Sequence, residues 1–190
     1  MPAPNPHAFE FLLSRRSRPA KTLTTPVPDQ SEILELLTVA ARTPDHGKLE
    51  PWRFIVLNKP EMNKLADVVT YLGQTKTLDA EKIAQGRKQF DDGQLAIVVV
   101  EVQKESAKIP VLEQTYSAGA VCLNLLNAAL AKGWGANWLT GWVSHDRDFM
   151  SQGLNLSANE RIAGIIHIGT ETAIPPERPR PNLDEIVTWA

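Results

Sequence analysis

Apolar residues recur along the chain at the spacing of a helix in several places. Residues 7–14 form the first such stretch, and a second helix is expected after the cap residues Asp29 and Glu32. The apolar face expected for it consists of Ile33, Leu34, Leu37 and Ala41. Pro44 should end that helix, because proline lacks the amide hydrogen that a helix interior requires.

Runs of β-branched and aromatic residues predict strands instead. Four strands are expected, at residues 52–57, 95–102, 136–140 and 162–169. The second, LAIVVVEV, is almost continuously apolar, so we expect a central strand that is covered on both faces. Helices are expected between the first two strands, at residues 61–73 and 78–89. Strands interleaved with at least five helices predict an α+β or mixed α/β fold.

The stretch from residue 112 to residue 132 is apolar around most of its circumference, which predicts a helix that is buried nearly all round. Small residues mark its first half, namely Ser117, Ala118, Gly119 and Ala120. They would allow another helix to approach closely. In a chain of this size a partner subunit is needed to cover one side of such a helix, so we expect a homodimer.

Composition narrows the class of protein. The 190 residues are 43% hydrophobic and 22% charged, which suits one globular domain over residues 1–190, and no repeat or separating linker is visible. The formal net charge is -2, with 20 basic and 22 acidic residues mixed along the chain. Nucleic acid is therefore not an expected partner.

Cysteine usage and the N-terminal segment indicate a compartment. Cys122 is the only cysteine, which excludes an internal disulfide and a cysteine-based zinc site. The N-terminal segment has no basic stretch followed by a long apolar run, and no run approaches the roughly 20 residues that span a bilayer. We expect a soluble, cytoplasmic protein that does not bind a membrane.

Three arginines stand within four residues at Arg15-Arg16-Ser17-Arg18, directly after the first expected helix. Guanidinium groups this close together repel one another unless they share an anion, and their planar fork suits phosphate. A solvated basic helix end is the alternative interpretation. For the motif alone, that alternative is favoured.

A second group of polar residues lies where the second helix gives way to a strand. Arg42, Asp45, His46 and Lys48 occur there, and in such a loop a rigid scaffold presents polar groups to a ligand. Taken alone, the Asp-His pair is better explained as a capping carboxylate beside a surface histidine.

A third group, KGWGANWLTG, begins at Lys132 and ends at Gly141. Gly133 should cap the end of the long helix, after which the chain enters a strand. The spacing of the glycines invites comparison with a dinucleotide-binding loop. A third glycine is absent, however, and the order is helix then strand, so we reject that interpretation.

In this order, the segments RRS, ARTPDH followed by PWRFIVL, GWGANW, and HIGT followed by PPERPRPNLDEIV resemble the nitroreductase family, and within it the compact YdjA-like branch. The resemblance covers nearly the whole chain. It implies an α+β fold with a mixed central sheet flanked by helices, built as an obligate homodimer. It also implies that FMN binds at the subunit interface and that both chains contribute to each site.

The resemblance implies three groups of cofactor-binding residues. Those that would hold the FMN phosphate and the polar edge of the ring are Arg15, Arg16 and Ser17. Those that would reach the flavin from the other subunit are Arg42 and His46. Those that would line the ring and the ribityl chain are Trp138, Leu139 and Thr140.

The implied activity is hydride transfer in two half-reactions. NADH or NADPH would reduce the flavin and leave, and an electron-poor acceptor such as a nitroaromatic or a quinone would take its place. No side chain has to be the catalyst, and the sequence has no nucleophile elbow, phosphate loop or paired-histidine metal motif. Residues 128–133 would contact the nicotinamide cofactor.

Some positions depart from the pattern of the family. Pro19 stands where many relatives carry a phosphate-binding lysine, so Arg18 or Lys21 would take over that contact. Arg178 and Arg180 near the C-terminus are further candidates for the phosphate.

Several rival functions remain open at this point. A flavin reductase or a dehalogenase would share the fold, and residues 70–91, which are expected to cover the pocket, would decide between them. A dimeric binding protein without redox activity is a rival of another class. A hydrolase that uses Asp45 and His46 would need a serine or cysteine nucleophile nearby in space, and the only thiol, Cys122, is expected to be buried. The histidines expected to be structural are His145 and His167.

Overall fold

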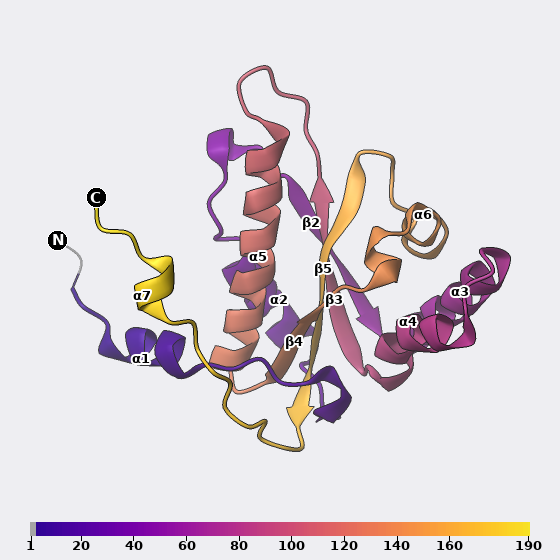
Figure 1. The fold of residues 1–190 in the computed structure, drawn as a ribbon, viewed down its shortest axis with the longest axis horizontal. Helices are drawn as coiled ribbons and strands as arrows, with labels where there is room; N and C mark the ends of the chain where they lie inside the picture. The colour runs from indigo at the N-terminus through magenta and orange to yellow at the C-terminus, as the bar shows by residue number, and fades with distance from the viewer. Residues whose placement is uncertain (1–2) are drawn as a thin grey trace.

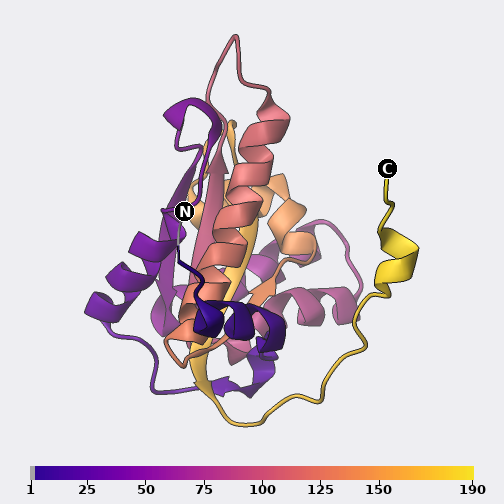
Figure 2. The same ribbon diagram turned by 90° about the vertical axis from the view of Figure 1, so that its left-hand side faces the viewer.

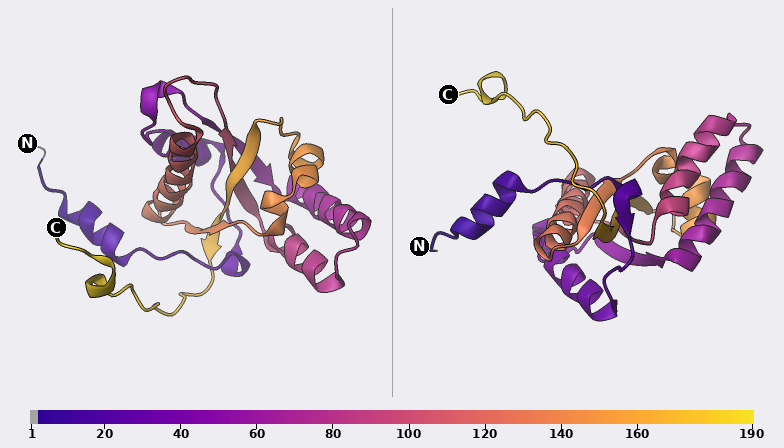
Figure 3. Two further views of the ribbon diagram at one scale, coloured as in Figure 1. Left: turned by 45° about the horizontal axis from the view of Figure 1, so that its top comes forward. Right: turned by 90° about the horizontal axis from the view of Figure 1, so that it is seen from below.

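A computed structural model describes residues 3–190 as a β-sheet with helices on both faces (Figure 1). Helices α2 (Gln30–Ala40) and α5 (Val111–Ala131) cover one face. Helices α3 (Lys59–Thr75), α4 (Ala80–Asp92) and α6 (Arg147–Leu154) cover the other face (Figure 3). Each face of the sheet therefore has its own hydrophobic core.

Five strands form the sheet: β1 (Leu23–Thr24), β2 (Trp52–Asn58), β3 (Leu95–Val102), β4 (Gly135–Leu139) and β5 (Glu160–Glu171). Strand β5 pairs with β1, β3 and β4, and β3 also pairs with β2. The expected central position of β3 is confirmed, because β2 and β5 flank it and it is buried over almost its whole length. The four expected strands are present, and β1 is an addition.

All four strand pairings in the described chain are antiparallel, so the expectation of a mixed sheet is wrong. The physical reason lies between β2 and β3. Helices α3 and α4 pack against each other and return the chain to the end of β2, where Leu95 pairs with Asn58. The expected α+β class itself is confirmed.

Helix α2 begins as the sequence predicts. The Asp29 carboxylate accepts a hydrogen bond from the Glu32 amide (2.9 Å), and the Glu32 carboxylate accepts one from the Asp29 amide (3.1 Å). The apolar face expected for this helix is wrong in part. The residues it buries are Leu36 and Ala40, whereas Leu34 and Ala41 are exposed. The buried residues are those that face α5.

Helix α5 is buried along one side and open along the other. Cys122 and Leu125 have no exposed surface, whereas Leu112, Tyr116 and Leu123 are exposed. A side chain at Gly119 would meet nothing within 4 Å. The expected burial nearly all round is therefore not found in the single chain, which leaves this open stripe uncovered.

The two ends of the chain stand away from the sheet. Helix α1 (Pro6–Ser14) and helix α7 (Leu183–Ile186) have no buried residues, and Figure 2 shows α7 well separated from the body. Their large exposed apolar side chains are Phe9, Leu12, Leu13, Leu183 and Ile186. Short 3-10 helices complete the chain: η1 (Ala20–Thr22), η2 (His46–Lys48) and η3 (Trp142–His145). In residues 3–190 no helix has the length and apolar character needed to cross a membrane.

Candidate functional site

The N-terminal arginine segment runs beside strand β4. The Arg18 amide donates to the Ala136 carbonyl (2.8 Å), and the Asn137 side-chain amide donates to the Arg18 carbonyl (2.7 Å). These bonds join Arg18 to Ala136 and Asn137, which lie 118 and 119 positions further along the chain and directly precede residues 138–140. Two of the three groups predicted from the sequence are therefore neighbours in one chain.

A cavity of about 270 Å³ lies where helix α1 ends, beside the end of α5. Its basic residues are Arg15, Arg16 and Arg18, and the other residues that line it are Phe11, Ser14, Leu130, Gly133, Trp134 and Glu171. Three arginines lining one cavity suit an anion with several oxygens, such as phosphate. Ser17, which was predicted beside them, is not part of this lining.

The three arginines differ in whether a carboxylate of the chain lies near the guanidinium group. Arg18 lies 3.3 Å from the Glu171 carboxylate, and Arg16 lies 4.0 Å from that of Glu177. Arg15 has no carboxylate partner within residues 3–190. Its guanidinium is therefore the most available positive charge in the cavity.

A trough lies between α4 and the end of β4, and residues 19–21, which follow the three arginines, line part of it. It consists of two neighbouring cavities of about 400 and 340 Å³, which share Gln85, Gln89 and Leu139. The predicted residues Trp138, Leu139 and Thr140 all line the larger cavity. Sequence reasoning missed the two glutamines, because amides four positions apart on a charged helix look like part of a solvated face.

Trp138 contributes to the trough and to the core at once. A Cβ on Gly164 of β5 would lie only 2.2 Å from the indole Nε1, so the ring occupies the space that a side chain would need there. The indole also packs against the core on the α5 face. Gly164 therefore sets how closely this tryptophan approaches the sheet.

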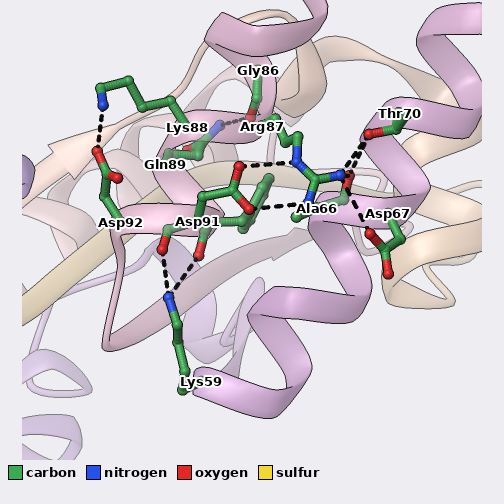
Figure 4. A network of polar contacts seen from close by, with 11 residues as sticks. Lys59, Ala66, Asp67, Thr70, Gly86, Arg87, Lys88, Gln89, Asp91 and Asp92 are labelled. Atoms are coloured by element: carbon green, nitrogen blue, oxygen red, sulfur yellow. Dashed lines mark hydrogen bonds and ion pairs between the residues drawn. The ribbon is translucent and has the colours of Figure 1, made fainter.

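Helix α4, which forms one wall of the trough, is held in place by polar contacts with α3 (Figure 4). The Arg87 guanidinium of α4 donates to the Thr70 hydroxyl (2.7 Å) and the Ala66 carbonyl (3.1 Å) of α3, and also to the Asp91 carboxylate of its own helix (2.9 Å). The Lys59 ammonium donates to carbonyls at the end of α4, including that of Asp91. The wall that carries Gln85 and Gln89 is thus anchored from behind.

The loop from Arg42 to Lys48 is fixed onto the first turns of α5. The His46 Nδ1 and the Glu113 carboxylate lie 2.6 Å apart. The Ser117 hydroxyl donates to the Pro44 carbonyl (3.0 Å) and accepts from the indole of Trp52 (3.1 Å). Sequence reasoning missed Glu113, since nothing local links it to a histidine 67 positions earlier.

A cavity of about 380 Å³ lies beside this loop, lined by Pro44, Asp45, His46, Glu113, Tyr116, Ser117 and Ala120. Tyr116 and Ala120 belong to the open side of α5. The predicted Arg42 is exposed and does not line the cavity. The loop therefore presents its polar groups at the surface that the chain leaves uncovered.

The two ends of α5 separate the two parts of the predicted site. Arg15 donates to the Asn127 side chain (3.2 Å), whereas His46 contacts Glu113, 14 positions earlier on the same helix. At 1.5 Å per residue these positions are about 21 Å apart along the helix. One chain does not bring Arg42 and His46 to the arginine cavity.

Three further side chains could carry chemistry: a cysteine and two histidines. Cys122 is buried as expected, and burial raises the pKa of its thiol to about 12, so a thiolate nucleophile is disfavoured there. His145 is exposed, and His167 is buried in β5 away from every cavity described above. The hydrolase hypothesis thus loses its thiol. The serine that lines the cavity with Asp45 and His46 is Ser117, and its hydroxyl is already bonded to the Pro44 carbonyl and the Trp52 indole.

Comparison with known proteins agrees with these features. The model of the nitroreductase family matches residues 12–170. The "Putative NAD(P)H nitroreductase" of Haemophilus influenzae is 34% identical over 170 residues, which cover 86% of this chain and 88% of that protein. The "Putative NAD(P)H nitroreductase YdjA" of Escherichia coli K12 is 28% identical over 163 residues, covering 86% of this chain and 87% of the relative.

Solved structures share the fold. A nitroreductase-like family protein from Bacillus cereus superposes with a TM-score of 0.80 at 25% identity, over 100% of this chain and 98% of that one. A "putative nitroreductase in complex with FMN" from Desulfovibrio desulfuricans superposes with a TM-score of 0.76 at 20% identity, over 99% of this chain and 98% of that one. From the extent of the family match and the 34% identity over most of its length, the chain belongs to the nitroreductase family, a family of oxidoreductases.

Proposed function

We propose that two copies of this chain form a cytoplasmic, FMN-dependent enzyme that uses NADH or NADPH to reduce nitroaromatics, quinones or similar electron-poor acceptors. One observation carries the proposal. Successive residues of one segment line the arginine cavity (Arg15, Arg16 and Arg18) and the amide-lined trough (residues 19–21), which suits a ligand with a phosphate at one end and a polar ring at the other.

The residues present fit FMN on their own chemistry. Arg15 offers a guanidinium without a carboxylate partner in the described chain, and a phosphate dianion needs such a group. The trough offers apolar surface from Leu139 and a buried amide oxygen from Gln89 that has no hydrogen-bond partner within residues 3–190. An apolar wall with few polar groups is typical of a cofactor site.

Bound FMN supplies the two-electron chemistry that links a nicotinamide donor to an electron-poor acceptor. The chain's own residues bind and orient. Arg15 and Arg16 hold the phosphate, while Leu139 and Thr140 hold the ring edge and keep water from it. Residues 128–133, at the end of α5 beside the arginine cavity, are proposed to contact the nicotinamide cofactor.

The partner subunit is proposed to complete each site with Arg42 and His46. Within one chain this loop lies about 21 Å along α5 from the arginine cavity, so a second chain has to supply it. A two-fold arrangement that packs the open stripes of α5 together would cover Leu112, Tyr116 and Leu123. Positive charge from Arg42 would then favour the reduced, more negative form of the cofactor.

Mixing two inactive variants tests this shared site. A chain carrying Arg15→Ala and a chain carrying both Arg42→Ala and His46→Ala are each expected to lose FMN. When the two are refolded together, the mixed dimer has one intact site, so about a quarter of the binding sites should return. Flavin fluorescence titration measures this. Recovery of no sites would contradict the proposal that two chains build each site.

The visible spectrum tests the proposal as a whole. The purified protein is expected to be yellow, and NADH or NADPH, added separately without oxygen, should bleach it. The donor that bleaches faster is the preferred one, and an added nitroaromatic or quinone should restore the colour. A colourless protein that takes up no added FMN would overturn the proposal and favour a dimeric binding protein.

A further inference from the structure

The side chain of Gln89 lies at the centre of the trough, where α4 meets the chain after β4. Gln89 lines both cavities of the trough. Its amide nitrogen donates to the Thr140 carbonyl (3.4 Å) and to the Gly86 carbonyl (3.5 Å). These bonds hold the amide between the helix and the segment predicted to line the flavin.

The amide oxygen of Gln89 has no such partner. Oε1 is buried, and no hydrogen-bond donor within residues 3–190 reaches it. A buried acceptor without a donor costs free energy, and native structures rarely leave one unsatisfied without a reason. At the wall of a ligand-sized cavity, a donor on a bound ligand would satisfy it.

The position of Gln89 is fixed before any ligand arrives. Helix α4 packs so closely on Trp142 that a Cβ at Gly86 would lie 2.3 Å from the indole Nε1. The same indole donates to the Lys82 carbonyl (3.1 Å), and Arg87 anchors the helix to α3 from the other side (Figure 4). An acceptor on a helix held at two sides is preorganised for its donor.

The chemistry of the donor is restricted. Oxidised flavin has a single ring N–H, at N3, whereas nitroaromatic and quinone acceptors have none. We propose that Gln89 binds this N3–H of FMN through Oε1 and thereby fixes how deep the ring lies in the trough. The inference rests on the proposed function, because it assumes that FMN occupies the trough.

Two variants remove the acceptor and nearly keep the volume of the side chain, Gln89→Leu and Gln89→Met. The matched control is Gln94→Leu, which removes a glutamine just after α4 that lines neither cavity of the trough. FMN affinity of the apo protein is measured by fluorescence quenching. We expect affinity to fall about tenfold in both Gln89 variants, and to stay unchanged in the control.

A second readout follows the N–H itself. With 15N-labelled FMN, solvent exchange of the N3 proton is expected to be faster in the folded Gln89 variants than in the wild type. Unchanged affinity and exchange would overturn the inference. A raised KM for the nicotinamide donor with unchanged FMN affinity would also overturn it and assign Oε1 to the nicotinamide carboxamide. Failure of the wild type to bind FMN would instead overturn the proposed function.

Discussion

Replacing Arg15 with alanine is expected to weaken FMN binding by about a hundredfold while the chain still folds. Arg15 is the arginine of the cavity that no carboxylate in residues 3–190 pairs with, so its full charge is available to a phosphate. Hydrogen bonds to charged groups contribute about 1.5–3 kcal/mol each, or roughly 10- to 150-fold in affinity. Titration of the apo protein with FMN measures the change.

The structure explains why folding should survive. Arg15 makes one side-chain hydrogen bond, to Asn127, and helix α1 before it buries no residue. The matched control is Lys64→Ala, which removes an exposed positive charge from α3, on the opposite face of the sheet. FMN affinity should be unchanged in the control. Equal affinities in Arg15→Ala and in the wild type would remove Arg15 from the phosphate site.

Long stretches of uniform pattern could be predicted from the sequence, because local preference and burial agree there. Strand β3 lies at the residues expected, 95–102, and helix α5 lies within one residue of its expected bounds. Strand β1 has only two residues, Leu23 and Thr24, and exists because their backbone pairs with residues almost 150 positions away. No local sequence pattern predicts such a pairing.

The apolar face of α2 shows a different limit. Apolar residues occupy more than one stripe of this helix, and packing against α5 selects Leu36 and Ala40 over Leu34. Periodicity indicates that a helix is amphipathic, but its neighbours decide which stripe is buried when several would serve. The same holds for the sheet, whose strand directions follow from the return of the chain through α3 and α4.

The candidate site, too, could be predicted from the sequence only in part. Its charged motifs were visible because three arginines within four residues are unusual in any chain, and the resemblance to a family supplied their grouping. The contacts that place these motifs were not visible. Glu113 beside His46 and Gln89 beside Thr140 come from helices whose polar faces look solvated, and each contact depends on the fold as a whole.

Lowering the pH from 7.5 to 4 is expected to reduce the free energy of unfolding through His167. Both ring nitrogens of this histidine are buried, and neither has a hydrogen-bond partner within residues 3–190. Burial lowers the pKa of His167 from 6.5 to about 4, because the charged imidazolium loses its hydration inside the protein. The folded chain therefore resists a proton that the unfolded chain accepts.

The direction and the size of the change in the free energy of unfolding follow from the difference in the pKa of His167 between the folded and the unfolded chain. Above pH 6.5 the imidazole is neutral in both states, and its contribution to stability is complete. As the pH falls towards 4, the unfolded state gains a proton first, and stability is lost. A pKa difference of 2.5 units, from 6.5 to about 4, corresponds to about 3 kcal/mol. Below pH 4 both states take up the proton, and this loss stops.

The variant His167→Leu isolates the effect, because it removes the titrating group and both unsatisfied nitrogens. Urea unfolding at pH 7.5 and at pH 4 should show the wild type losing about 3 kcal/mol more than the variant. Carboxylates also titrate in this range, and the hydrogen bond from Arg53 lowers the pKa of Glu160, but both proteins share that loss. Equal losses in the two proteins would mean that His167 gains a proton-stabilising partner on folding. The ring packs against Gly93, where an added Cβ would lie 3.0 Å from Nδ1, so such a partner would require the chain that covers this face of the sheet to move.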